Sequence, residues 1–215
     1  MKGISVELLA AVFKEMKLAD PTSKVVQAPW SRGYAEAQIR PNLLLFSTVR
    51  TPGREKKFKW AGPILDSDIV LIARKEDNIR FHPENRPYSQ TFAVSHQDVV
   101  ELELLRLGIP HSKIYHWNAL KTAPLMLVRG RVDMWGYDRV AASYTLTRLG
   151  FNPRDFKVVH ELLRNPYYFA FSKGTDDRFV ADFQEALTRL NKAGQTKRII
   201  GRYLSETVSG LKAAE

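Results

Sequence analysis

Residues 47–63 read Ser47-Thr-Val-Arg-Thr-Pro-Gly-Arg54-Glu-Lys-Lys-Phe-Lys-Trp60-Ala-Gly-Pro63, and they follow a short apolar run at residues 43–46. The apolar run predicts a buried strand, and the Thr-Pro-Gly sequence predicts a turn directly after it. Arg54 therefore stands near a strand end, close in sequence to the hydroxyl groups of Ser47 and Thr51. A guanidinium in such a place is suited to hold a carboxylate through two parallel hydrogen bonds. The alternative is a surface turn whose basic residues stay in water.

Segments with helical periodicity alternate with short apolar segments along the whole chain. Helices are predicted over residues 4–17, 31–38, 98–107, 118–128, 138–149, 176–193 and 196–206. Strands are predicted over residues 25–28, 43–46, 69–73, 91–95, 113–116, 132–134, 157–160 and 167–171. Such alternation is typical of an α/β fold with largely parallel sheets.

The charge balance is strongly basic, with 33 Lys and Arg residues against 23 Asp and Glu residues, a net charge of +10. A surplus of this size suits nucleic acid, an acidic surface or an anionic solute as partner. The basic residues are scattered, however, and no run exceeds two consecutive basic residues in the local clusters at residues 50–59 and 192–202. No nucleic-acid-binding motif accompanies them, so we expect no nucleic acid partner.

Three further features of the sequence exclude particular kinds of protein or site. The 215 residues include no cysteine, which excludes disulfides, thiol catalysis and cysteine-based zinc sites. No apolar run approaches the roughly 20 residues that a membrane-spanning helix needs, so we do not expect a membrane protein. The N-terminus does not read as a signal peptide, because Glu7, Lys14 and Glu15 interrupt what would be its apolar region.

A second segment has the form of a strand that runs into a helix. Residues 131–142 read Arg-Val-Asp-Met-Trp-Gly-Tyr-Asp-Arg-Val-Ala-Ala, with Asp138 at the expected helix start. Together with residues 47–63, the segment Phe-Ala-Phe-Ser-Lys at residues 169–173 and the last helix after Gly194, this pattern resembles the bacterial extracellular solute-binding proteins of family 3. The order and spacing of these segments extend the resemblance over nearly the whole chain.

The resemblance implies a type II periplasmic-binding-protein-like α/β fold, in which two crossing strands join two lobes and the ligand binds between them. Lobe one would be residues 1–67 plus 163–215, and lobe two would be residues 68–162. The family's first strand precedes its first helix, and this sequence starts at that helix, so we expect the fold to lack its first strand. We expect a monomer, or a dimer formed through the resulting gap, because an unpaired strand edge invites a partner.

The resemblance also implies a function. It predicts a non-catalytic, periplasmic receptor of a bacterial ABC-type uptake system, which binds a small polar ligand, amino-acid-like or carboxylate, and passes it to a membrane permease. No cofactor is implied. A few relatives of this fold are dehydratases of small carboxylates, so the alternative is such an enzyme, with Asp138, Asp98 or Glu101 as its acid or base. A sensor module is a third reading.

The family pattern assigns roles to individual residues. Arg54 would hold the ligand's carboxylate, and Asp138 would hold the ligand's ammonium group. The alternative for Asp138 is an ordinary helix N-cap, and both roles are compatible. Ser47 and Thr51 would donate hydroxyl or backbone hydrogen bonds to the ligand, with local turn bonding as their alternative.

Three other residues belong to the predicted site. Trp30 precedes a helix and would stack its ring at the cleft mouth, with a place in the core as its alternative. Tyr137 beside Asp138 would form an apolar or cation–π wall. Asp98 lies in the turn of lobe two that faces the ligand, where its charge would repel an anion.

The histidines show no pattern of a metal site. The sequence has five of them, His82, His96, His111, His116 and His160. None forms a pair with the helical spacing of zinc-binding histidines, so we expect no metal site.

Overall fold

The computed structural model of the chain describes residues 3–207 and 211. The chain forms two compact units. Unit 1 comprises Met1–Ala28, Arg32–Asp66 and Asn165–Ser205, whereas unit 2 comprises Pro29–Ser31, Ser67–Arg164 and Glu206–Glu215. The chain therefore completes unit 1 only after it has passed through most of unit 2.

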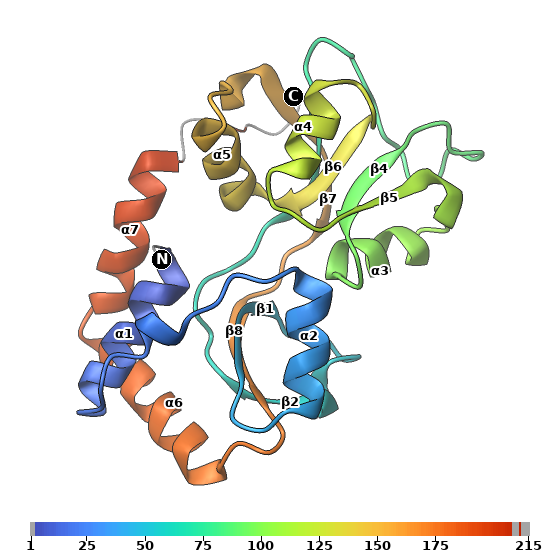
Figure 1. The fold of residues 1–215 in the computed structure, drawn as a ribbon. Helices are drawn as coiled ribbons and strands as arrows, with labels where there is room; N and C mark the ends of the chain where they lie inside the picture. The colour runs from blue at the N-terminus through green and yellow to red at the C-terminus, as the bar shows by residue number, and fades with distance from the viewer. Residues whose placement is uncertain (1–2, 208–210, 212–215) are drawn as a thin grey trace. The chain divides into compact units, whose positions relative to one another are not determined.

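Unit 1 is built on a three-stranded sheet with the order β1-β8-β2. Its strands are β1 (Leu44–Val49), β2 (Phe58–Ala61) and β8 (Tyr167–Ser172), and its helices are α1 (Ile4–Glu15), α2 (Trp30–Ile39), α6 (Asp177–Lys192) and α7 (Gln195–Thr207). Both outer strands run antiparallel to β8. Helices α1, α6 and α7 lie on one side of this sheet and α2 lies on the other (Figure 1).

The core of unit 1 forms where α1 and α6 meet β8. Helix α6 buries residues at helical spacing, among them Val180, Phe183, Leu187 and Leu190. The ring of Phe183 is fully buried and contacts four other aromatic rings, those of Phe13, Phe169, Phe171 and Phe179. An apolar helix face of this kind gains its stability from packing against the sheet.

Unit 2 is built on a five-stranded sheet with the order β5-β4-β6-β3-β7. The strands are β3 (Ile69–Arg74), β4 (Phe92–Ser95), β5 (Ile114–Trp117), β6 (Met134–Asp138) and β7 (Phe156–Leu163). The helices are α3 (Val99–Arg106), α4 (Thr122–Val128) and α5 (Arg139–Arg148). Strand β4 is parallel to β5 and β6, whereas β3 is antiparallel to β6 and β7.

The predicted alternation of helices and strands is confirmed, but the predicted strand directions are wrong for much of the structure. Antiparallel pairs make up the sheet of unit 1 and one side of the sheet of unit 2. Local periodicity identifies an apolar strand without identifying its neighbour, and the neighbour decides the direction of the ladder.

The predicted strand at residues 25–28 is also wrong, because this segment is irregular. The side chain of Val26 is 81% exposed, so the segment buries little apolar surface. Without a neighbouring strand, the N–H and C=O groups of an extended segment bond to water and no ladder forms.

Other element boundaries differ from the sequence prediction. Helix α4 begins at Thr122, four residues after the predicted start, and β6 begins at Met134, where the predicted strand ended. Strand β2 was not predicted, because it is only four residues long and Lys59 interrupts its apolar residues; it forms by pairing with β8. None of the helices among the described residues is long and apolar enough to cross a membrane.

The packing of Phe183 yields a test of the unit 1 core. We expect Phe183→Ala to lower the free energy of unfolding by about 3–5 kcal/mol, because it removes a fully buried ring and leaves a cavity. Arg178→Ala, at an exposed position of the same helix, is the control. Urea unfolding followed by circular dichroism measures both, and a loss below about 1 kcal/mol for Phe183→Ala would contradict this description of the core.

Candidate functional site

The predicted anion-binding residues of unit 1 lie at the end of β1 and in the turn that follows it. Strand β1 is irregular between Leu45 and Thr48, and Ser47 adopts a left-handed conformation with φ 54°. Ser47 is exposed, and its Oγ lies 2.8 Å from the Oγ of Ser5 in α1. Its hydroxyl group is therefore engaged with α1 and not within its own turn.

Arg54 is buried, with 2% of its surface exposed. Its backbone N–H donates to the carbonyl oxygen of Thr51 at 2.9 Å, which closes the turn. Its Nη1 donates to the carbonyl oxygen of Val49 at 3.3 Å, and its guanidinium lies 5.2 Å from the ring centroid of Tyr34. A buried cation is costly unless it is hydrogen-bonded, so these contacts fix the position of the guanidinium. The alternative of a solvated surface arginine is wrong for Arg54.

A second arginine of the same turn, Arg50, has a different environment. Its Nε and Nη2 donate to the carboxylate of Glu55 at 2.8 and 2.5 Å. The guanidinium also lies near the rings of Trp60 and Tyr168, 5.6 and 5.2 Å from their centroids. The hydrogen bond from Arg50 lowers the pKa of Glu55 below its ordinary value. Arg50 is thus a half-buried arginine, paired with Glu55, next to the fully buried one.

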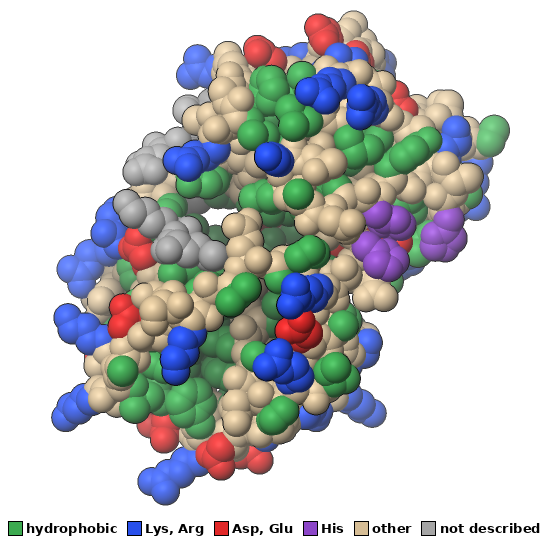
Figure 2. Space-filling model, viewed as in Figure 1, with side chains coloured by type: hydrophobic (Ala, Val, Ile, Leu, Met, Phe, Trp, Pro, Cys, Tyr) green, Lys and Arg blue, Asp and Glu red, His purple; other side chains and the backbone are tan. Residues whose placement is uncertain are grey.

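The turn is positively charged. Lys57 donates from Nζ to the hydroxyl oxygen of Tyr34 at 3.2 Å, so the phenol ring contacts both Arg54 and Lys57. Arg50, Arg54 and Lys57 outnumber the acidic Glu55, which favours an anion at this turn. On the face drawn in Figure 2, by contrast, Lys and Arg side chains are spread out and interspersed with acidic ones.

In unit 2, Asp138 is the last residue of β6 and the N-cap of α5. Its Oδ1 accepts a hydrogen bond from the Ala141 N–H at 2.9 Å, and its Oδ2 accepts one from the Asp68 N–H at 3.2 Å. The capping role is therefore confirmed, whereas the role toward a ligand ammonium stays a prediction.

Aromatic residues gather beside Asp138. The ring of Tyr137 stacks on Trp135 at 5.1 Å between centroids and meets Trp117 edge-on at 5.8 Å. Burial raises the pKa of the Tyr137 hydroxyl far above its ordinary value, and the nearby charges of Asp98 and Asp138 raise it further. The phenol therefore stays neutral at physiological pH. Trp135 is fully buried, so it is part of the core.

The remaining predicted residues lie at helix starts. Asp98 is the N-cap of α3 and accepts from the Val99 N–H at 2.6 Å. Glu101 accepts from the N–H of Gln97 at 2.5 Å. In a strict capping box it would accept from the N–H of the N-cap residue, Asp98, which is one residue later. Trp30, the half-buried first residue of α2, is grouped with unit 2.

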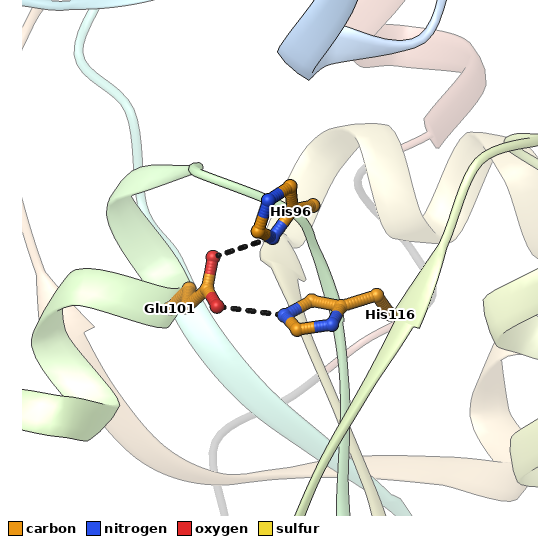
Figure 3. Close-up of side chains that lie close together, drawn as sticks. All are labelled: His96, Glu101 and His116. Atoms are coloured by element: carbon orange, nitrogen blue, oxygen red, sulfur yellow. Dashed lines mark hydrogen bonds and ion pairs between the residues drawn. The ribbon is translucent and has the colours of Figure 1, made fainter. Parts of the chain in front are cut away.

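The structure also brings together three residues that sequence reasoning did not connect, His96, Glu101 and His116 (Figure 3). The His116 Nε2 lies 2.7 Å from Glu101 Oε1, and the His96 Nδ1 lies 3.5 Å from Oε2. Burial by itself raises the pKa of Glu101, but the Gln97 N–H and the two imidazoles outweigh it and lower the pKa. Glu101 is therefore ionised at neutral pH. The signal in the sequence was weak, because His96 lies in the turn after β4, whereas His116 lies in β5, twenty positions later.

Comparisons with known proteins agree with this architecture. The family model described as bacterial extracellular solute-binding proteins, family 3, matches residues 1–206. A mutant of ArgBP from T. maritima superposes with a TM-score of 0.80 at 20% identity, covering 95% of this chain and 86% of that chain. The substrate binding protein of an amino acid ABC transporter gives a TM-score of 0.79 at 17% identity, with 94% and 88% covered.

A third solved structure is the ancestral amino acid-binding protein AncCDT-1, a precursor of cyclohexadienyl dehydratase. It gives a TM-score of 0.78 at 21% identity, with 94% of this chain and 85% of that chain covered. At these identities the similarity establishes the fold, which is the mixed α/β fold of periplasmic binding proteins, as predicted. No curated protein matches the sequence significantly.

The cap at Asp138 gives a test of the local geometry in unit 2. We expect Asp138→Ala to lower the free energy of unfolding by about 1 kcal/mol, because the Ala141 N–H loses its acceptor. Asp138→Asn keeps an acceptor oxygen for the Ala141 N–H but sets its NH2 group against the Asp68 N–H, so it should lose less than Asp138→Ala. Denaturant unfolding compares the two variants, and an equal loss would mean that the bond to the Ala141 N–H does not carry the effect.

Proposed function

Because the chain belongs to the bacterial extracellular solute-binding proteins of family 3, we propose that it is a non-catalytic receptor of a bacterial ABC-type uptake system. Its ligand is a small polar solute, either amino-acid-like or another carboxylate. In this proposal units 1 and 2 are the two lobes of the family fold, the protein works in the periplasm, and its partner is a membrane permease.

The observation that carries the proposal is the buried guanidinium of Arg54. The Val49 carbonyl oxygen and the Tyr34 ring hold it in one position at the end of β1. A guanidinium that is already fixed loses less conformational entropy when it binds a carboxylate. Because the surrounding protein excludes water, each hydrogen bond to the ligand is also stronger there. Ser47 and Thr51 are the proposed neighbours of the bound carboxylate.

Unit 2 is proposed to contribute the contacts to the opposite charge. Asp138 would accept from the ligand's ammonium group, with Tyr137 and Trp30 as its aromatic neighbours. Asp98 stands at the N-terminus of α3, where its charge disfavours a carboxylate. The anionic end of the ligand is therefore proposed to lie at Arg54, away from the negative charge of Asp98.

The acids available for proton transfer favour the receptor over the dehydratase. Asp138, Asp98 and Glu101 each accept a hydrogen bond from a backbone N–H at the start of α5 or α3. Such bonds hold these carboxylates as hydrogen-bond acceptors, a role that suits the ammonium group of a ligand better than proton exchange with a substrate. We therefore propose ligand binding without turnover.

Replacement of Arg54 tests the proposal. A thermal-shift screen of the natural amino acids and small carboxylates identifies a ligand first, and calorimetry then measures its affinity. We expect Arg54→Ala to weaken binding by about 2–5 kcal/mol, because a desolvated charge pair is lost. Arg54→Lys should recover little of this, because lysine lacks the planar fork.

Arg50→Ala is the matched control, since Arg50 belongs to the same turn but is paired with Glu55. We expect it to change the affinity by less than about 1 kcal/mol. Circular dichroism establishes that each variant is folded. Unchanged affinity in a folded Arg54→Ala variant, or no stabilisation of the wild-type protein by any compound of the screen, would contradict the proposal.

A further inference from the structure

Two imidazole rings and one carboxylate converge on the surface of unit 2. One ligand atom each from His96, Glu101 and His116 lies within 4.8 Å of the other two. The two rings are 4.7 Å apart between centroids, and the carboxylate oxygens point one to each ring (Figure 3). The proposed solute-binding site does not include these three residues.

The sheet fixes the relative positions of the three residues. Parallel strands β4 and β5 pair Val94 with His116, and His96 follows two residues after Val94, immediately beyond the end of β4. Glu101 comes from the first turn of α3, which starts three residues after His96. The cluster therefore rests on strand β5, on the turn that directly follows the neighbouring strand β4, and on a helix start.

The cluster is closed at its base and open to solvent. The side chain of Glu101 is 7% exposed, whereas those of His96 and His116 are 49% and 36% exposed. Figure 2 shows histidine side chains gathered at the molecular surface. The Gln97 N–H, which donates to Glu101 Oε2 at 2.5 Å, holds the buried carboxylate in place. Such an outer hydrogen bond orients a ligand for its metal.

The distances suit a small divalent ion. Zinc–ligand distances of about 2.0–2.1 Å in a tetrahedron place neighbouring ligand atoms about 3.3 Å apart. The 2.7 Å separation joins His116 Nε2 to Glu101 Oε1, and the 3.5 Å separation joins His96 Nδ1 to the other carboxylate oxygen, Oε2. One ligand atom of each residue lies within 4.8 Å of the other two, so the exposed rings have to close in by no more than about 1.5 Å to reach tetrahedral spacing.

We propose that His96, Glu101 and His116 bind one divalent transition metal ion of the Zn²⁺ class. Imidazole nitrogen favours zinc, copper and nickel, whereas Mg²⁺ and Ca²⁺ require oxygen ligands. Three protein ligands leave the fourth tetrahedral position to water or to a solute atom. The proposal does not depend on the receptor function and replaces the expectation from sequence spacing that no metal site exists.

Metal binding is tested on the full chain, purified without a polyhistidine tag and treated with chelator. Calorimetric titration with ZnCl₂ should show one ion per chain, and MgCl₂ should show no binding. Excess Zn²⁺ should raise the melting temperature, since an ion that binds the folded state stabilises it. Co²⁺ should give the intense visible absorption of a tetrahedral site. Absence of Zn²⁺ binding to the folded wild-type protein would overturn the proposal.

Variants locate the site. We expect His96→Ala and His116→Ala each to weaken Zn²⁺ binding by at least the roughly 10–100-fold that loss of an outer-shell partner costs. His82→Ala is the matched control, because His82 is an exposed histidine 3.4 Å from Glu84 and lies outside the cluster. It should bind Zn²⁺ like the wild type. If an alanine variant fails to fold, His116→Gln or His96→Gln replaces it. Wild-type affinity in folded variants at both positions would overturn the proposal.

Discussion

The pairing of β8 with both β1 and β2 is the constraint on which unit 1 depends. Strands β1 and β2 both pair with β8, which lies about a hundred positions later in the chain. The turn that carries Arg50 and Arg54 connects these two strands, so β8 anchors it at both ends. The long-range ladder therefore determines where the guanidinium of Arg54 lies, and the local sequence supplies the turn itself.

In unit 2 the functional candidates are also structural residues. Asp98 and Asp138 cap α3 and α5, and Glu101 both accepts from Gln97 and contacts two histidines. Helix starts at the carboxyl ends of strands concentrate unpaired N–H groups, which attract acidic side chains. The same geometry that stabilises these helices thus places polar side chains at the edge where binding sites of α/β proteins form.

Sequence reasoning reached the local motifs of the predicted site but not their tertiary contacts. The turn of Arg54 and the cap at Asp138 follow from residue types that act over three or four positions, and the structure places both as helix or turn residues. The burial of Arg54 depends on Tyr34, which belongs to α2 and has no sequence signal that links it to the turn. The contact of His96 with His116 depends on the register of β4 and β5.

The sequence by itself determined the alternation of helices and strands, the helix starts at Asp98 and Asp138, and the helix ends at residues 107 and 149. Propensity, capping and periodicity set these features because they act within a few residues. Only the tertiary structure decided the antiparallel ladders around β8, the irregular course of residues 25–28 and the meeting of two histidines at Glu101. A strand pattern states which side chains are buried, whereas the identity of the neighbouring strand is set by the packing of the whole unit.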